Sequence, residues 1–410
     1  MQYNKSIYIQ RKEFVMSMQT LAFSGAAAWL DYGDFGAVVN DAAQTVQFRL
    51  FFPDHTKDSS QYFQEHVFTD YEGKVANVDR GGLPRIKDIE IVGSTPVQSH
   101  KMMAPVPFPE RNPTGLLYES KPVRLWEGFH LYSYLVTFQN GETRLCNDPC
   151  AKYCSRKNGR DRSAFAIGRR DVKALRIKNR LPLKELNICE MKIDDFTDAL
   201  IHRESPFDII RKKINHLMEM GVNAVEFPPV TVWPGWGFNC SYIPFLYFAV
   251  TGRYIQSDTE PLEKLSRLKM IINELHNKDI HVIVDGVFRH VFDEFPYYQL
   301  YENRNLSPFV GIYGETAFGK DLSFYNKCTR ELVFDICRYW IDEFRIDGIR
   351  FDHAGGFDDY DEQNRGVKQL VGKLKEYVCS RGERNISFIT GRRYPDSLGT
   401  DRQPEYSRCS

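Results

Sequence analysis

The sequence predicts a protein with two parts of different class, an antiparallel β part followed by an α/β part. Residues 28–150 contain short segments of alternating apolar and polar residues, which Pro and Gly separate. From residue 181 onward, short apolar segments alternate with stretches that repeat apolar residues at helical spacing. That alternation is typical of a parallel sheet whose strands are joined by helices.

The β part is predicted to be an antiparallel β-sandwich. Its clearest strands are residues 45–52, 86–93 and 129–138. In the last of these, apolar residues such as Leu131 and Tyr134 are interspersed with polar ones, as in a strand with one buried face. We therefore expect five segments along the chain: an N-terminal extension (1–27), the sandwich (28–150), a basic and polar linker (151–180), the α/β part (181–390) and a polar tail (391–410).

Five strands, with helices between them, are predicted in the α/β part. The first helix begins with Ser205 as its cap and Pro206 in its first turn, and Gly221 follows as a C-terminal cap. A doubly wound sheet and a (β/α)8 barrel both fit the alternation. The predicted strands are residues 186–191, 222–227, 280–285, 347–352 and 385–390.

Polar residues collect where the third and fourth of these strands end. Asp285 and His290 lie in "DGVFRH", and Arg350 and Asp352 lie in "DGIRFD". The carboxyl ends of parallel strands carry the chemistry of α/β proteins. Arg350 and Asp352 are two residues apart, on the same side of a strand, so the guanidinium would keep the carboxylate ionised. A glycosidase nucleophile needs such a carboxylate, although a structural ion pair is an alternative interpretation.

Composition gives no sign of a nucleic-acid or membrane partner. Lys+Arg and Asp+Glu are equal at 54 each, so the formal net charge is zero. No segment reaches the ~18 apolar residues that a membrane helix needs. Aromatic residues make up 14% of the chain and crowd residues 233–254, which must either pack on other parts of the protein or bind a ligand.

The nine cysteines fit a reducing cytoplasm, the simplest compartment for this chain. Cys146, Cys150 and Cys154 are close enough in sequence for a metal site, but they form no CxxC pair and have no adjacent His. We therefore expect no metal, and no cofactor is indicated. Secretion is the alternative, because residues 14–30 resemble the apolar core of a signal peptide, although Gln19 and the flanking charges disfavour it.

Taken together, these segments resemble the α-amylase superfamily, glycoside hydrolase family 13. "DGVFRH" (285–290) matches the family's D-x-V-x-N-H motif, and "GIRFD" (348–352) matches its G-x-R-x-D motif. "NICEMKIDDFT" (187–197) and "MGVNAVEFPPV" (220–230) are similar to its first-strand and second-strand segments. "WGFN" (236–239), followed by "YFAVTGRY", resembles a loop of branching enzymes and trehalose-releasing hydrolases. The first part resembles the sandwich carbohydrate-binding module that precedes the barrel in those subfamilies, which favours the (β/α)8 barrel.

The resemblance implies a role for each matching residue. Asp352 would be the nucleophile that forms a β-glucosyl-enzyme, and Arg350 would fix and ionise it. Asp285 and His290 would support the sugar in the −1 subsite. Phe238 would stack on a sugar where the family usually has Tyr. The other two residues that we assign to substrate binding are Trp236 and His353.

Two departures from the family pattern affect these expectations. Arg289 stands where the D-x-V-x-N-H motif has Asn, a residue often tied to structural calcium, and a cation there argues against calcium. The family's acid/base Glu follows the fifth strand, but Gly391 occupies that position and Glu405 is the next glutamate. Asp396 is a substitute acid five residues later. We count five of the eight barrel strands, so the chain resembles a barrel truncated after the fifth.

Three functional interpretations follow. The first is an α-glucan-active hydrolase or transglycosylase by descent, inactive in this chain for lack of the acid/base Glu. The second is a non-catalytic protein that binds starch, glycogen or maltodextrin. The third is a doubly wound phosphatase or dehydrogenase, which the absence of a glycine-rich phosphate loop after any predicted strand disfavours.

Overall fold

The computed structural model describes most of the α/β part and much of the β part. The described residues are 31–53, 83–93, 100–101, 106–107, 115–157, 160–168, 170–192, 206–234, 241–252, 261–310, 319–324, 326–354 and 366–390. The predicted N-terminal extension and polar tail lie outside these ranges, as do Ser205 and Asp396. Within them, no helix is long and apolar enough to cross a membrane.

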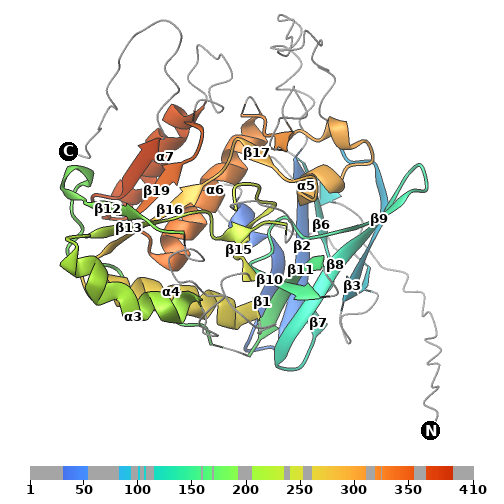
Figure 1. Ribbon diagram of the computed structural model, residues 1–410. Helices are drawn as coiled ribbons and strands as arrows, with labels where there is room; N and C mark the ends of the chain where they lie inside the picture. Colours follow the sequence, from blue (N-terminus) through green and yellow to red (C-terminus); the bar gives the residue numbers. More distant parts are fainter. Residues whose placement is uncertain are drawn as a thin grey trace, which may run out of the picture.

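Two antiparallel sheets form the first part of the chain (Figure 1). The predicted strands at 45–52, 86–93 and 129–138 are confirmed as β2, β3 and β8. The two sheets contact each other through Phe48 on β2, whose ring lies 4.9 Å from that of Tyr132 and 5.6 Å from that of Phe165. One sheet contains β1 (Gly36–Asn40), β2 (Thr45–Pro53), β5 (Val106–Pro107), β6 (Gly115–Glu119) and β7 (Val123–Arg124); the other contains β3 (Ile86–Gly93), β4 (His100–Lys101), β8 (Gly128–Phe138), β9 (Thr143–Cys146), β10 (Tyr153–Lys157) and β11 (Arg160–Ile167).

The segment 151–180 is not only a linker, because strands β10 and β11 lie within it. They pair with each other, and β11 pairs with β8, so the second sheet extends past residue 150. The polar composition of this segment concealed them, since a strand at the surface of a sheet carries polar residues on its exposed face. The dipeptide Asn158-Gly159 was the available signal, because it favours a hairpin turn.

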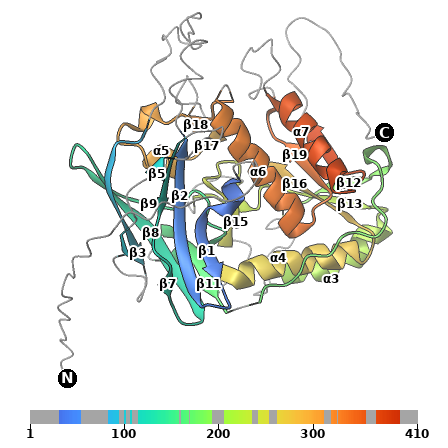
Figure 2. The same cartoon turned by 180° about the vertical axis from the view of Figure 1, so that it is seen from behind.

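The α/β part contains a five-stranded parallel sheet, and all five predicted strands are confirmed. Its order follows the chain without reversal, whereas a doubly wound sheet reverses its order at a switch point. Right-handed crossovers between successive strands place the connecting helices on one face of the sheet, where α3 packs on α4 and α6 packs on α7 (Figure 2). The strands are β12 (Ile188–Glu190), β13 (Ala224–Phe227), β16 (His281–Gly286), β19 (Gly348–Phe351) and β20 (Ser387–Thr390), and the helices are α3 (Pro206–Glu219), α4 (Pro261–His276), α6 (Lys327–Phe344) and α7 (Val367–Ser380).

Short elements lie between the long strands and helices of both parts. The aromatic segment predicted at 233–254 contributes β15, whose residues are all buried. Tyr247 of β15 stacks on Phe288, and Trp340 of α6 donates its indole N–H to the Tyr247 carbonyl over 2.9 Å. The described rings of this segment therefore support the core. The short elements are β14 (Thr231–Val232), β15 (Leu246–Val250), β17 (His290–Val291), β18 (Lys320–Asp321), α5 (Pro296–Gln299) and the 3-10 turns Tyr32–Asp34, Leu183–Glu185 and Arg304–Leu306.

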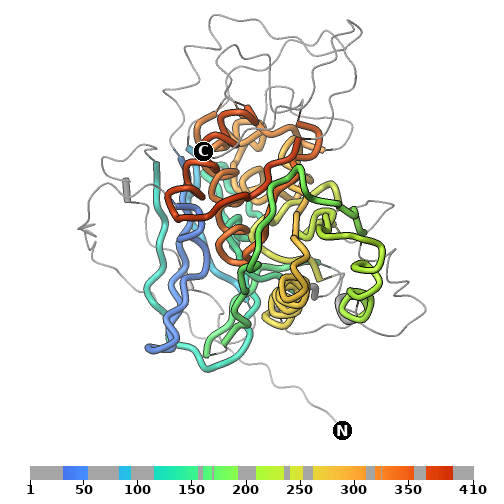
Figure 3. Tube along the Cα trace, turned by 90° about the vertical axis from the view of Figure 1, so that its left-hand side faces the viewer, coloured from blue at the N-terminus to red at the C-terminus, as the bar shows by residue number. Residues whose placement is uncertain are grey.

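The β part and the α/β part lie side by side (Figure 3). Buried residues of both parts belong to one hydrophobic core. Tyr32 is fully buried and packs edge-on against Phe51 of β2 and Tyr297 of α5. Its backbone N–H donates to the carboxylate of Asp335 on α6 over 2.7 Å. The Tyr297 hydroxyl donates to the Phe51 carbonyl over 3.0 Å. These contacts hold α6, which precedes β19, against the antiparallel strands.

Candidate active site

Arg350 joins the two sequence motifs. Its Nη1 atom donates to both carboxylate oxygens of Asp285, over 2.9 and 2.7 Å. The same atom lies 2.9 Å from Oδ1 of Asp352. The strand register explains the arrangement, because Asp285 on β16 pairs directly with Arg350 on β19 and Asp352 follows β19. One guanidinium nitrogen thus lies between two carboxylates at the carboxyl ends of neighbouring strands.

Asp285 is the most enclosed of these groups, with 2% of its surface exposed. Its Oδ2 atom also accepts a hydrogen bond of 2.6 Å from the Tyr242 hydroxyl. Burial raises the pKa of Asp285 to about 6, although the hydrogen bonds from Arg350 and Tyr242 favour the ionised form. The sequence patterns did not single out Tyr242, because its role depends on a tertiary contact with β16.

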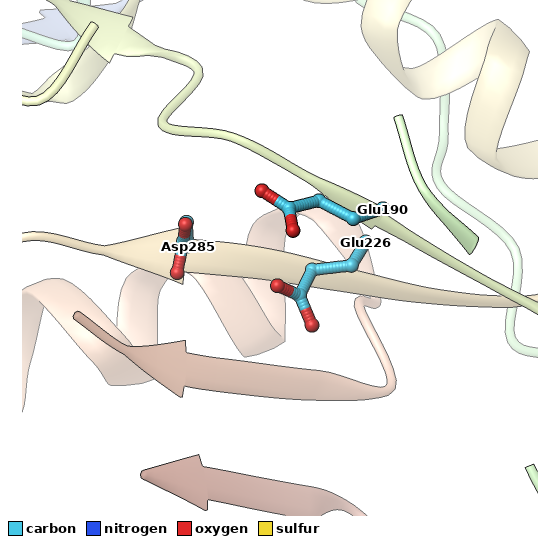
Figure 4. Close-up of side chains that lie close together, drawn as sticks. All are labelled: Glu190, Glu226 and Asp285. Atoms are coloured by element: carbon cyan, nitrogen blue, oxygen red, sulfur yellow. The ribbon is translucent and has the colours of Figure 1, made fainter. Parts of the chain in front are cut away.

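Two glutamates complete a group of three carboxylates on the same sheet (Figure 4). Glu190 on β12 pairs with Glu226 on β13, and Glu226 lies opposite Ile283, two residues before Asp285. Alternation along a strand then places Glu226 and Asp285 on the same face. One carboxylate oxygen from each of the three lies within 4.8 Å of the others. The available signal was a carboxylate inside the apolar strands "NICEM" and "VNAVEF".

The two histidines of the motifs are close to the same strand ends. His290 is buried, and its Nε2 atom lies 2.8 Å from the Tyr242 carbonyl. Burial lowers the pKa of His290, so the neutral ring donates this hydrogen bond. His353 has a left-handed backbone (φ 50°), and its Nε2 atom contacts the guanidinium of Arg289. The cation that replaces the family's Asn therefore reaches the residue after Asp352.

The structure brings together five of the seven predicted site residues. Asp285, His290, Arg350, Asp352 and His353 all belong to β16, β17, β19 or the residues directly after β19. Trp236 and Phe238 lie outside the described residues.

Asp347 directly precedes β19 and belongs to a different cluster of side chains. Its carboxylate accepts hydrogen bonds of 2.8 Å from Arg180 and 2.9 Å from the backbone N–H of Val282, and lies 2.8 Å from Nε2 of His276. This cluster lies at the amino end of β19 and is separate from the site.

The site contains carboxylates of the kind that ligate metal ions. Within the described ranges, Glu190, Glu226 and Asp285 are the one group of three or more His, Cys, Asp or Glu residues with ligand atoms this close. Asp285 already accepts hydrogen bonds from Arg350 and Tyr242, and the adjacent guanidinium opposes a second cation. Cys146, Cys150 and Cys154 are buried, and the described cysteines form no disulfide bond.

Several curated proteins are similar to this chain in sequence. No protein-family model matches the chain. Among curated proteins, Pullulanase A of Streptococcus pneumoniae serotype 2 is 26% identical over 273 residues, which is 56% of this chain and 21% of the relative. Isoamylase 3 of Oryza sativa subsp. japonica is 31% identical over 208 residues, 42% of this chain and 26% of the relative. Malto-oligosyltrehalose trehalohydrolase of Saccharolobus solfataricus is 28% identical over 210 residues, which is 49% of this chain and 34% of the relative.

These homologues are α-amylase superfamily enzymes. The predicted resemblance to glycoside hydrolase family 13 is confirmed, because the named homologues are glycoside hydrolases of that family. The α-amylase superfamily relatives are longer, since the chain spans about a fifth to a third of the length of the curated proteins cited above.

Solved structures agree in fold. A pullulanase of Anoxybacillus sp. LM18-11, solved with maltotriose, matches with a TM-score of 0.64 at 19% identity. The match covers 87% of this chain and 48% of the pullulanase chain. The pullulanase of Bacillus acidopullulyticus has a TM-score of 0.63 at 17% identity, with 90% of this chain and 42% of its own covered.

Proposed function

We propose that this chain carries the nucleophile half of a retaining α-glucan site. The observation that carries the proposal is the position of Arg350 between Asp285 and Asp352 at the carboxyl ends of β16 and β19. A guanidinium hydrogen-bonded to a carboxylate favours its charged form and restricts its orientation. Both properties are required of a group that attacks the anomeric carbon of a sugar.

In the proposed reaction, Asp352 attacks the anomeric carbon and forms a covalent glycosyl-enzyme. The glycosidic oxygen leaves with the cleaved part of the glucan and takes up a proton. Asp285 accepts hydrogen bonds from sugar hydroxyls in the −1 subsite, and His290 supports the same sugar from the adjacent strand end. Phe238 and Trp236 are proposed to stack on sugars, and His353 is proposed to contact the substrate beside Asp352.

We further propose the finer fold assignment. The five strands in chain order, with all helices on one face, are consistent with five strands of a (β/α)8 barrel. The two antiparallel sheets are proposed to be a sandwich of the carbohydrate-binding type. The likeness to pullulanase structures over most of this chain supports both assignments.

These residues include no clear acid to protonate the leaving oxygen. A retaining glycosidase places its acid/base about 5–5.5 Å from the nucleophile. The sequence has Gly391 directly after β20, and no glutamate from there to residue 404. We therefore propose that these residues cleave natural α-glucans slowly or not at all. Binding of starch, glycogen or maltodextrin without cleavage is the second candidate function, favoured by the same observation.

An activated substrate separates the two halves of the mechanism. Fluoride leaves without protonation, so α-maltotriosyl fluoride tests the nucleophile alone. We expect a burst of fluoride and an intact-mass increase of one maltotriosyl group for the wild-type chain, and neither for Asp352→Asn. Asp279→Asn, an exposed change of the same type, is the matched control. A burst of equal size in Asp352→Asn would show that the nucleophile is wrong.

Binding is measured separately, by calorimetry with maltotriose. Affinity in both the wild-type chain and Asp352→Asn supports a glucan site whatever the rate of cleavage. No affinity for maltotriose and no retention on glycogen, in a folded sample, would overturn the proposed function in both of its forms.

A further inference from the structure

The face of the parallel sheet that carries the site has an imbalance of charge. Within the described ranges, one guanidinium, that of Arg350, lies among the carboxylates of Glu190, Glu226, Asp285 and Asp352. Arg350 donates to two of them, Asp285 and Asp352. If all four were ionised, the group would carry a net charge of −3 in a partly buried place. Like charges at this separation favour the uptake of a proton.

Glu226 is the member best placed to hold that proton. Glu226 is 8% exposed, whereas Glu190 is exposed, and within the described part of the chain no hydrogen bond or ion pair is found for the Glu226 carboxylate. Its side chain points towards Glu190 and Asp285 (Figure 4). A buried carboxyl group with no partner is more stable in its neutral form.

We propose that Glu226 is a positioning residue that is neutral when the site is competent and, on ionising, disturbs the bridge that Arg350 makes between Asp285 and Asp352. This rests on the proposed function, because the bridge is the part of the glucan site that Glu226 acts on. An ionised Glu226 adds a third carboxylate that competes for the single guanidinium. The site then loses alignment as Glu226 loses its proton.

The electrostatics of every neighbouring element support this assignment. Burial and the ionised Asp285 raise the pKa of Glu226 to about 7, Arg350 lowers it in part, and Glu190 raises it again. Glu190 lies on β12 and Asp285 on β16, the two strands beside β13, and Arg350 lies on β19, the next strand of the sheet. Glu226 therefore changes its charge near neutral pH, and the site changes with it over a narrow range of pH.

The first test does not need activity or ligand. The whole chain, labelled with ¹³C at the glutamate carboxyl carbon, is titrated by NMR from pH 4 to 9. We expect a resonance that titrates near pH 7, that is absent in Glu226→Gln and that moves to lower pH in Glu190→Gln. The exposed Glu376→Gln leaves it in place. A midpoint below pH 5.5 for the resonance that Glu226→Gln removes would overturn the proposal.

The second test measures the effect on the site. Maltotriose affinity is followed by calorimetry at pH 6, 7 and 8. We expect a several-fold weakening in the wild-type chain between pH 6 and 8, and less than a twofold change in Glu226→Gln, whose amide is neutral throughout. Equal pH dependence in the two proteins would overturn the positioning role. If maltotriose binds neither protein at any pH, the proposed function fails, while the NMR titration still decides whether Glu226 holds the proton.

Discussion

Asp347 and Asp352 flank β19 and lie at its opposite ends. Asp347 is 1% exposed and contacts Arg180 and His276 at the amino end. Asp352 contacts Arg350 at the carboxyl end. A strand of four residues is enough to separate a buried structural carboxylate from a carboxylate in a site. The two groups therefore have different consequences when changed.

Asp347→Asn is expected to lower the free energy of unfolding by about 1–3 kcal/mol at pH 7, because Arg180 and His276 lose a buried charged acceptor and Arg180 keeps only Glu383 as a carboxylate partner among the described residues. Burial opposes its ionisation, but the hydrogen bond to His276 and the charge of Arg180 outweigh burial and lower the pKa of Asp347. The stabilisation is therefore present above the pKa of an unfolded Asp and is lost as the pH falls. Urea unfolding at pH 7 and pH 3 measures this, with Asp279→Asn as the surface control. A loss that is equal at both pH values would contradict it.

Arg350→Gln is expected to destabilise the protein more at pH 8 than at pH 5. The buried Asp285, whose pKa is already raised to about 6, loses its only cationic partner among the described residues, so its pKa rises further. The destabilisation grows as the pH rises through that value, because ionisation of Asp285 is then unfavourable in the folded state. Thermal unfolding at the two pH values, compared with the exposed change Arg384→Gln before β20, tests the sign. A constant difference in Tm would count against it.

Glu226→Gln is expected to stabilise the protein at pH 8 and to have little effect at pH 4.5. The pKa of Glu226 in the folded protein, about 7, is above its ordinary value of 4.5. The wild-type chain therefore loses stability as the pH rises from about 4.5 to about 7, by up to roughly 3 kcal/mol. The amide has no charge to lose, so the variant does not. Chemical denaturation across this pH range measures the difference, and a larger gain at pH 4.5 than at pH 8 would refute the assignment.

Asp335→Asn is expected to stabilise the protein by about 1–3 kcal/mol at pH 8 or above. Burial and the nearby Asp31 raise the pKa of Asp335 to about 8, so ionisation of Asp335 is costly in the folded state. The amide oxygen can still accept the hydrogen bond from the Tyr32 backbone N–H. The gain should disappear below about pH 3, where Asp335 is protonated in both states. Asp335→Leu, which removes the acceptor, should destabilise at both pH values; a stabilising Leu variant would mean that the hydrogen bond to Tyr32 contributes nothing.

The periodicity of the sequence was enough to predict the elements and to locate the site at the strand ends. Apolar runs of four to six residues identified β12, β13, β16, β19 and β20, because both faces of a strand in a covered parallel sheet are apolar. Asp285, Arg350 and Asp352 were identified for the same reason, since a charged residue directly after such a run must lie where the strand ends. The polar alternation of β10 and β11 concealed them within the expected linker.

Contacts between elements were decided by the tertiary structure. Register places Glu226 on the same face as Asp285, and the strand order places Arg350 between Asp285 and Asp352. The described residues just before β15 bring the Tyr242 hydroxyl to Asp285. Sequence spacing tells which face of its own strand a side chain occupies, but it carries no information on which strand lies beside it or at what register. The sequence by itself therefore determined the strands and the carboxylates at their ends, and only the packing of those strands decided which carboxylates share a guanidinium and which one is left to hold a proton.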